Sequence, residues 1–141
     1  STRLPRAIRD VYKRQLLTSC GTHADQHALQ DALSEHAGDA SVTLHVSDVY
    51  PNATQVLLVC PYAGQAANDL LGRHVFRNYE DSYDSTNWVL VQQPNGKVSK
   101  VALERSQVDL CAGDAEAVLA LNPDAQMVFE GRDGVWALRR R

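Results

Sequence analysis

The sequence predicts an α+β fold: a single, mainly antiparallel β-sheet of about five or six strands with two or three helices packed on it. Three observations lead to this class. Short apolar runs recur along the chain, turn residues separate them, and stretches with helical spacing lie between them. With 141 residues, 44% of them hydrophobic, the chain can bury one core. Its longest apolar run, residues 56–60, is far shorter than the ~20 residues of a membrane-spanning helix.

The first half of the chain alternates helical and strand patterns. Leu29, Leu33 and neighbouring small residues recur at helical spacing, which predicts a helix over residues 25–37. Its apolar stripe is thin, so we expect it to pack weakly. Residues 42–46 alternate apolar and polar side chains, as a half-buried strand does. Residues 56–60 are apolar throughout, which is typical of an interior strand covered on both faces.

The second half is dominated by two hairpins. A short helix over residues 64–72, closed by a glycine, precedes them. Turn residues at 94–96 and at 131–134 then predict two tight reversals. The hairpin strands are predicted at residues 88–91, 98–103, 127–129 and 135–138. Residues 115–121 fit either a short helix or a strand.

Basic residues are concentrated at the start of the chain. Residues 1–15 hold five basic residues and one acidic residue, whereas residues 16–141 hold nine basic and sixteen acidic residues. This acidic body disfavours nucleic-acid binding, which needs clustered cations. Residues 10–15 resemble the translation of a transposon-end adapter used in sequencing libraries, so we expect residues 1–19 to be an artefact followed by a truncated signal remnant. The alternative is a native basic arm that binds a membrane or nucleic acid.

The segment Leu17, Thr18, Ser19 and Cys20 resembles the lipobox that ends a bacterial lipoprotein signal peptide. The resemblance implies that the Cys20 thiol receives a diacylglyceryl group and becomes the first residue of the mature protein. Buried methylenes at ~0.8 kcal/mol each then hold the domain on a bilayer. Most of the apolar part of a signal peptide is missing before Leu17. The alternative is a structural or free cysteine.

If Cys20 is acylated, the other two cysteines, Cys60 and Cys111, form an even pair. Both follow short apolar segments, so both are expected at strand ends. An exported protein lives where disulfides persist, which favours a bridge between them. The alternative is two buried, inert thiols.

The chain is similar to a group of small bacterial lipoproteins over residues 42–138. In that group a strand ends in a Pro-Tyr pair and leads to a short helix closing with Leu-Gly, as residues 59–62 and 70–72 do here. The sequence departs from the group at residues 53–55, where Ala-Thr-Gln replaces the usual Trp-Asp. The resemblance implies a fold and a location in the cell envelope. It assigns no catalytic residue to this chain. Accordingly, residues 20–40 are expected to form a tether with a weak helix, ahead of one globular domain over residues 41–141.

Few residues suggest a binding or catalytic site. His23 and His27 have metal-ligand spacing, but no third ligand is identified, so a solvated tether is the better interpretation and no metal is expected. The loop over residues 77–84 combines three carboxylates with two tyrosines and lacks the glycine of a calcium loop. Tyrosines favour protein contacts there. The predicted binding residues are Tyr62, Arg73, Tyr79, Asp81 and Tyr83.

These observations predict a lipid-anchored domain at the extracytoplasmic face of a bacterial cell membrane. We expect it to work by binding rather than catalysis, without a cofactor. Its expected partners are the membrane, through the lipid, and another envelope protein, but not nucleic acid. The alternative is a small extracytoplasmic enzyme with its site near Tyr62, Arg73 and residues 79–84. A pocket where those groups converge would favour the enzyme.

Overall fold

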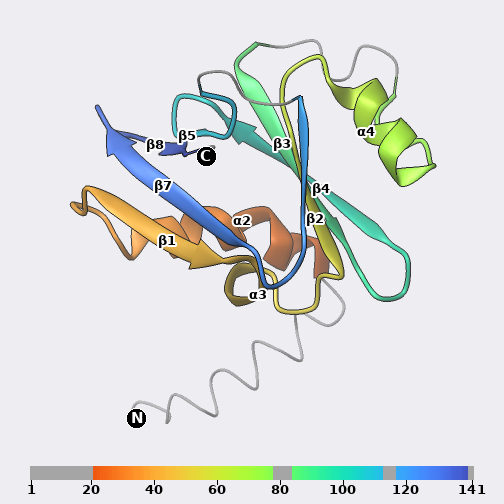
Figure 1. Cartoon of the computed structure of the whole chain (residues 1–141), viewed down its shortest axis with the longest axis horizontal. Helices are drawn as coiled ribbons and strands as arrows, with labels where there is room; N and C mark the ends of the chain where they lie inside the picture. Colours follow the sequence, from red (N-terminus) through yellow and green to blue (C-terminus); the bar gives the residue numbers. More distant parts are fainter. Residues whose placement is uncertain (1–20, 78–83, 113–116, 140–141) are drawn as a thin grey trace, which may run out of the picture.

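The computed structural model describes residues 21–77, 84–112 and 117–139, and of residues 21–25 it describes the backbone alone (Figure 1). Three helices and eight strands occur within these ranges. In chain order they are α2 (Gly21–Ser34), β1 (Ser41–His45), α3 (Val46–Val49), β2 (Gln55–Val59), α4 (Gly64–Leu71), β3 (Thr86–Gln92), β4 (Val98–Glu104), β5 (Val108–Asp109), β6 (Val118–Leu121), β7 (Gln126–Arg132) and β8 (Val135–Leu138). The predicted α+β class is confirmed.

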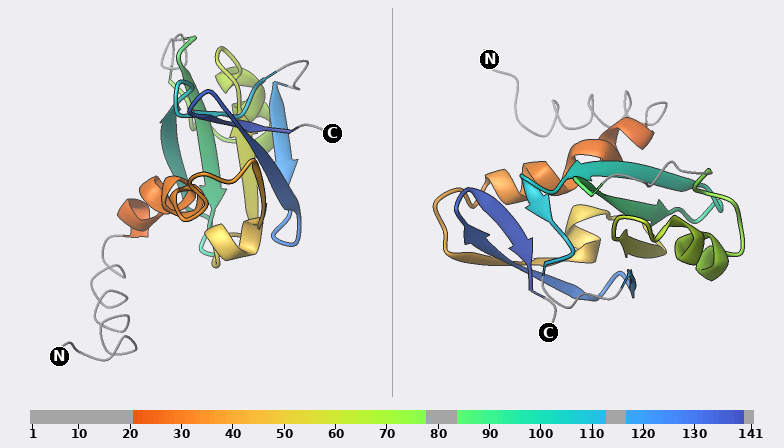
Figure 2. Two further views of the ribbon diagram at one scale, coloured as in Figure 1. Left: turned by 90° about the vertical axis from the view of Figure 1, so that its left-hand side faces the viewer. Right: turned by 90° about the horizontal axis from the view of Figure 1, so that it is seen from above.

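The strands form two sheets, not the single sheet predicted from the sequence. One has the strand order β1-β7-β8-β5 and the other β4-β3-β2-β6; we call them the β7 sheet and the β2 sheet. Within each sheet, every pair of neighbouring strands is antiparallel except β5 with β8, which is parallel. In Figure 1 the β7 sheet lies on the left and the β2 sheet on the right, and Figure 2 shows β6 at the free edge of the β2 sheet.

The described chain passes between the two sheets four times, and α3 stabilises one of these passages, the turn between β6 and β7. The backbone N–H of Val46 donates to Ala125 O at 2.9 Å, and the N–H of Ser47 donates to Pro123 O at 2.9 Å. These two bonds hold the connection between β6 and β7 against α3. A hydrophobic pattern cannot reveal such a corner, since strands on both sides of it alternate in the same way.

The main core lies between the two sheets and includes α2 and α3. Strand β2 separates this core from a second one. Val56 and Leu58 belong to the main cluster, and Leu57 and Val59 belong to the cluster beneath α4. All four side chains are fully buried. Strand β2 is therefore covered on both faces, as the apolar run predicted.

Turn residues located most of the remaining elements correctly. Both predicted hairpins are present, as β3–β4 and β7–β8. Helix α4 is also confirmed: it ends at Gly72, whose φ of 70° is the left-handed conformation that favours glycine. The ambiguous segment resolves as a strand, β6, over its described part. The sequence missed the one-turn helix α3. The two-residue strand β5 lies in the short apolar segment before Cys111, where a strand end was expected.

Helix α2 corrects the expectation of a weakly packed helix over residues 25–37. It begins and ends earlier, over Gly21–Ser34. Leu29 and Leu33 are each only 1% exposed and belong to the main core. Two large leucines with small neighbours are enough to bury this face of the helix, because the helix lies against β4 and α3. Its packing is therefore not weak at these positions.

Candidate functional site

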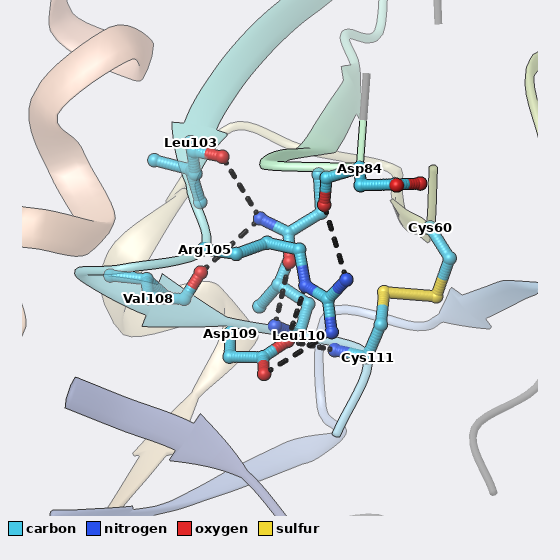
Figure 3. A network of polar contacts seen from close by, with 9 residues as sticks. Cys60, Asp84, Leu103, Arg105, Val108, Asp109, Leu110 and Cys111 are labelled. Carbon is cyan, nitrogen blue, oxygen red and sulfur yellow. Dashed lines mark hydrogen bonds and ion pairs between the residues drawn. A yellow bond between two sulfur atoms is a disulfide. The ribbon is translucent and has the colours of Figure 1, made fainter. Parts of the chain in front are cut away.

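A disulfide joins the ends of two strands from different sheets. Cys60 directly follows β2, and Cys111 lies two residues after β5. Their sulfur atoms are 2.09 Å apart and their Cα atoms 5.8 Å apart. Figure 3 shows the bridge beside a network of polar contacts. The predicted pairing of Cys60 with Cys111 is confirmed, and the disulfide connects the β2 sheet to the β7 sheet.

The polar network beside the disulfide is centred on Asn87 of β3, which is fully buried. The Asn87 side-chain amide donates to Leu103 O at 3.1 Å and to Val108 O at 3.2 Å. Its Oδ1 accepts the Leu110 N–H at 2.8 Å. These bonds hold the connection from β4 to β5 against β3 (Figure 3).

An ion pair completes this network. The Arg105 guanidinium contacts the Asp109 carboxylate at 3.1 Å and also donates to Asp84 O at 3.1 Å. Asp109 in turn accepts the backbone N–H of Cys111 at 3.0 Å. Each of these polar groups fixes a stretch of backbone next to the disulfide. We therefore assign the network a structural role, because buried polar groups satisfied in this way rigidify a fold.

A second buried asparagine fixes the loop after α4. Asn68 is 6% exposed, and its amide donates to Phe76 O at 3.0 Å. Its Oδ1 accepts the backbone N–H groups of Val75 and Phe76 at 2.8 and 2.9 Å. The loop from residue 72 to residue 77 is thus tied to the inner face of α4.

The same loop is joined to the β3–β4 hairpin by two cations. Lys100 Nζ donates to Val75 O at 3.0 Å and lies 5.0 Å from the centroid of the Phe76 ring and 5.7 Å from that of Trp88. Arg73 donates to Gly96 O in the hairpin turn. Two segments more than twenty residues apart in sequence therefore form one surface.

We call this surface the α4 surface and define it by six side chains: Tyr62, Leu70, Arg73, Arg77, Lys97 and Lys100. Of these six, only Tyr62 and Arg73 are binding residues predicted from the sequence. Leu70, Arg77, Lys97 and Lys100 were not among the predicted binding residues, because no local sequence pattern shows that α4 and the β3–β4 turn meet. The local sequence indicated only where α4 ends, at Gly72, and where the hairpin turns, at Gly96.

Two of the predicted binding residues, Tyr62 and Arg73, are among the residues that the structure describes. Tyr62 precedes α4, with a φ of 65°, and Arg73 follows α4. An eight-residue helix is about 12 Å long, so the two side chains start at opposite ends of it. The predicted residues Cys20, Tyr79, Asp81 and Tyr83 lie outside the described residues.

Glu130 of β7 forms an ion-pair group with two arginines. Its carboxylate lies 2.7 Å from Arg132 and 3.2 Å from Arg139. The hydrogen bond from Arg132 is the main cause that lowers the pKa of Glu130, and the charge of Arg139 adds to the effect. Glu130 therefore stays ionised to lower pH than an ordinary glutamate and keeps both cations paired.

Metal ligation finds no support in the described part of the chain. No group of three histidine, cysteine, aspartate or glutamate residues could hold an ion there. His27 is exposed on α2, and the side chain of His23 lies outside the description. Among the described helices, none has the length and hydrophobicity needed to cross a membrane. Comparisons of the chain with protein-family models, curated proteins and solved structures gave no match.

Proposed function

We propose that the chain is the folded part of a lipid-anchored protein at the extracytoplasmic face of a bacterial membrane, where it acts by binding. The disulfide between Cys60 and Cys111 is the observation that carries this proposal. Disulfides persist in oxidising compartments and are rare in the reducing cytosol of mesophiles. The lipobox-like residues ending at Cys20 supply the anchor.

Binding accounts for the α4 surface better than catalysis does. Tyr62 and Leu70 are 62% and 57% exposed, and they are the large hydrophobic side chains most open to solvent in the described structure. Exposed apolar groups of this kind commonly mark contact surfaces. The alternative is a small enzyme with its site near Tyr62, Arg73 and residues 79–84; Tyr62 and Arg73 lie at opposite ends of α4.

The proposal is tested by acylation in cells. A complete lipoprotein signal peptide is placed before Leu16, the chain is expressed in a bacterial host, and incorporation of an alkyne-labelled fatty acid is measured. We expect label on the chain and partition into the membrane fraction. The variant Cys20→Ser should lose both. The matched variant Cys111→Ser should keep the label, because it removes a different thiol. Export of the unmutated chain without label contradicts the proposal.

A further inference from the structure

Strand β1 forms an edge of the β7 sheet (Figure 1). It pairs with β7 along its whole length, and no other described strand lies on its outer side. At its two ends, Gly131 N–H donates to Ala40 O and Val46 N–H donates to Ala125 O, both at 2.9 Å. These bonds fix which backbone groups of β1 point toward β7.

Alternate residues of β1 direct their backbone groups away from β7. In an antiparallel strand, neighbouring residues point their N–H and C=O groups to opposite sides. Since Ala40 and Val46 bond on the β7 side, Ser41, Thr43 and His45 direct theirs outward. All three residues are exposed, and no backbone group in the described ranges bonds to them there. This side of β1 can therefore accept another strand.

The β1 edge lacks the features that usually prevent strand pairing. Charged residues, proline, bulges or a covering segment protect most exposed edges. Strand β1 contains no lysine, arginine, aspartate, glutamate or proline, and its register with β7 is unbroken. After it, Val46 and Val49 of α3 are buried, so the chain turns toward the core instead of running along the edge.

The other three edges of the two sheets are less suited to pairing. Strand β4 carries Lys100 and Glu104 and has α2 against it. Strand β5 has two residues. Strand β6 has four residues and directs the backbone groups of about half of them outward. Within the described ranges, β1 is therefore the longest edge strand without a charged residue.

The outer side of β1 is complementary to itself. When two β1 strands run antiparallel with Thr43 opposite Thr43, Ser41 of each strand lies opposite His45 of the other. Three such pairs, each joined by two hydrogen bonds, give about six bonds and use every outward group. On the core face, Val42 then lies opposite Leu44, which is only partly buried in one copy. Cross-strand pairs of this kind stabilise neighbouring strands.

Charge favours a second copy over a charged peptide. The chain has a formal net charge of -3, yet β1 holds no acidic or basic residue besides a histidine. The carboxylates on either side of β1, Asp39 and Asp48, lie 3.2 and 3.8 Å from His36 and His45 of the same copy. A second β1 adds no charge beside them, whereas a strongly charged peptide finds no opposite charge within the strand.

We infer that two copies of the chain associate through β1, antiparallel about a two-fold axis at Thr43, so that their β7 sheets join into one. The inference goes beyond the proposed function, because it requires neither acylation nor a membrane. Paired strands of five residues bury less than the ~1,000 Å² expected of a stable interface, so the dimer should be weak and should depend on concentration.

The first test measures association of the full chain by sedimentation equilibrium. Cys20→Ser is present in every sample, so that this thiol cannot crosslink two chains. We expect the dimer fraction to rise between ~10 μM and ~1 mM, because weak interfaces fill only at high concentration.

Amide hydrogen exchange, measured residue by residue by NMR, locates the interface. At the higher concentration the N–H groups of Ser41, Thr43 and His45 should exchange more slowly, because pairing supplies them with acceptors. The N–H groups of Val42 and Leu44 already bond to β7, so their exchange should not change.

Variants at Thr43 test the two-fold axis. Thr43→Lys places like charges opposite each other and should weaken dimerisation about tenfold, as should Thr43→Glu. An equal mixture of these two variants should regain association, because opposite charges then meet. Thr43→Val keeps the backbone groups and the branched shape, so it should associate like the parent. Ala66→Lys, exposed on α4, adds the same charge elsewhere and should change dimerisation less than about twofold.

Several results would overturn the inference. A chain that stays monomeric at ~1 mM would leave the β1 edge to a strand of another protein. Undiminished association of the Thr43→Lys variant, or a lysine–glutamate mixture that associates no better than either variant alone, would exclude pairing about Thr43. Slowed exchange at Val118 and Ala120 in place of Thr43 would assign the contact to β6. None of these results bears on acylation, because the samples carry serine in place of Cys20.

Discussion

At the scale of single residues, the side chains of two buried asparagines form hydrogen bonds with backbone groups of neighbouring segments. Asn87 and Asn68 each donate to a carbonyl and accept from backbone N–H groups in a neighbouring loop. Asparagine is usually exposed, so composition and periodicity give no sign that these two are buried. The sequence did indicate Cys60 and Cys111 correctly, because cysteines can be counted and paired without knowledge of packing.

Asn87→Ala should lower the free energy of unfolding by about 3 kcal/mol, because it removes three hydrogen bonds and leaves buried backbone groups without partners. Urea denaturation followed by tryptophan fluorescence measures the change. Asn52→Ala, at an exposed loop position, is the control and should change stability by less than ~0.5 kcal/mol. Equal stability of the two variants would show that the Asn87 hydrogen bonds contribute little.

At the scale of elements, the sequence correctly predicted structures that depend on nearby residues, but it did not predict which distant strands pair. The turn at Gly96 and the αL residue Gly72 are decided within a few residues, so the β3–β4 hairpin and α4 could be located from sequence. Strand β6 pairs with β2, about sixty residues earlier, and its pattern alone did not separate helix from strand. The packing of helix α2 could not be predicted for the same reason, because the burial of Leu33 depends on contact with the distant strand β4.

Leu33→Ala tests whether α2 is an integral part of the fold. Leu33 is 1% exposed in the main core, so we expect a loss of about 3 kcal/mol in the free energy of unfolding from the lost burial and the cavity. Urea unfolding monitored by circular dichroism gives the value. Gln26→Ala, exposed on the same helix, should stay within ~0.5 kcal/mol of the parent. A similarly small change for Leu33→Ala would mean that α2 detaches at little cost.

At the scale of the whole molecule, one covalent bond and one shared core connect the two sheets. The disulfide spans a sequence separation of 51 residues and joins the segment after β2 to the segment after β5. The main core draws side chains from both sheets, α2 and α3. Unfolding must therefore disrupt both sheets together, and the crosslink restricts the unfolded chain.

Removing the disulfide by Cys60→Ala with Cys111→Ala should lower the free energy of unfolding by roughly 4 kcal/mol in the chain-entropy model. Urea denaturation of the oxidised proteins measures the difference. Adding a reductant to the parent should bring it toward the double variant. The control Cys20→Ser should leave stability within ~0.5 kcal/mol, because it removes no crosslink. If reductant leaves the urea midpoint of the parent unchanged, the bridge does not stabilise the fold.

The sequence by itself determined the α+β class, both hairpins, the interior strand at residues 56–60, α4 and the pairing of Cys60 with Cys111. Each follows from contacts within about ten residues or from the small number of cysteines. Only the tertiary structure decided that the strands divide into two sheets, and that Arg73 and Lys97 share one surface. Those outcomes depend on which distant surfaces pack together, and similar alternating patterns in many short strands leave that choice open.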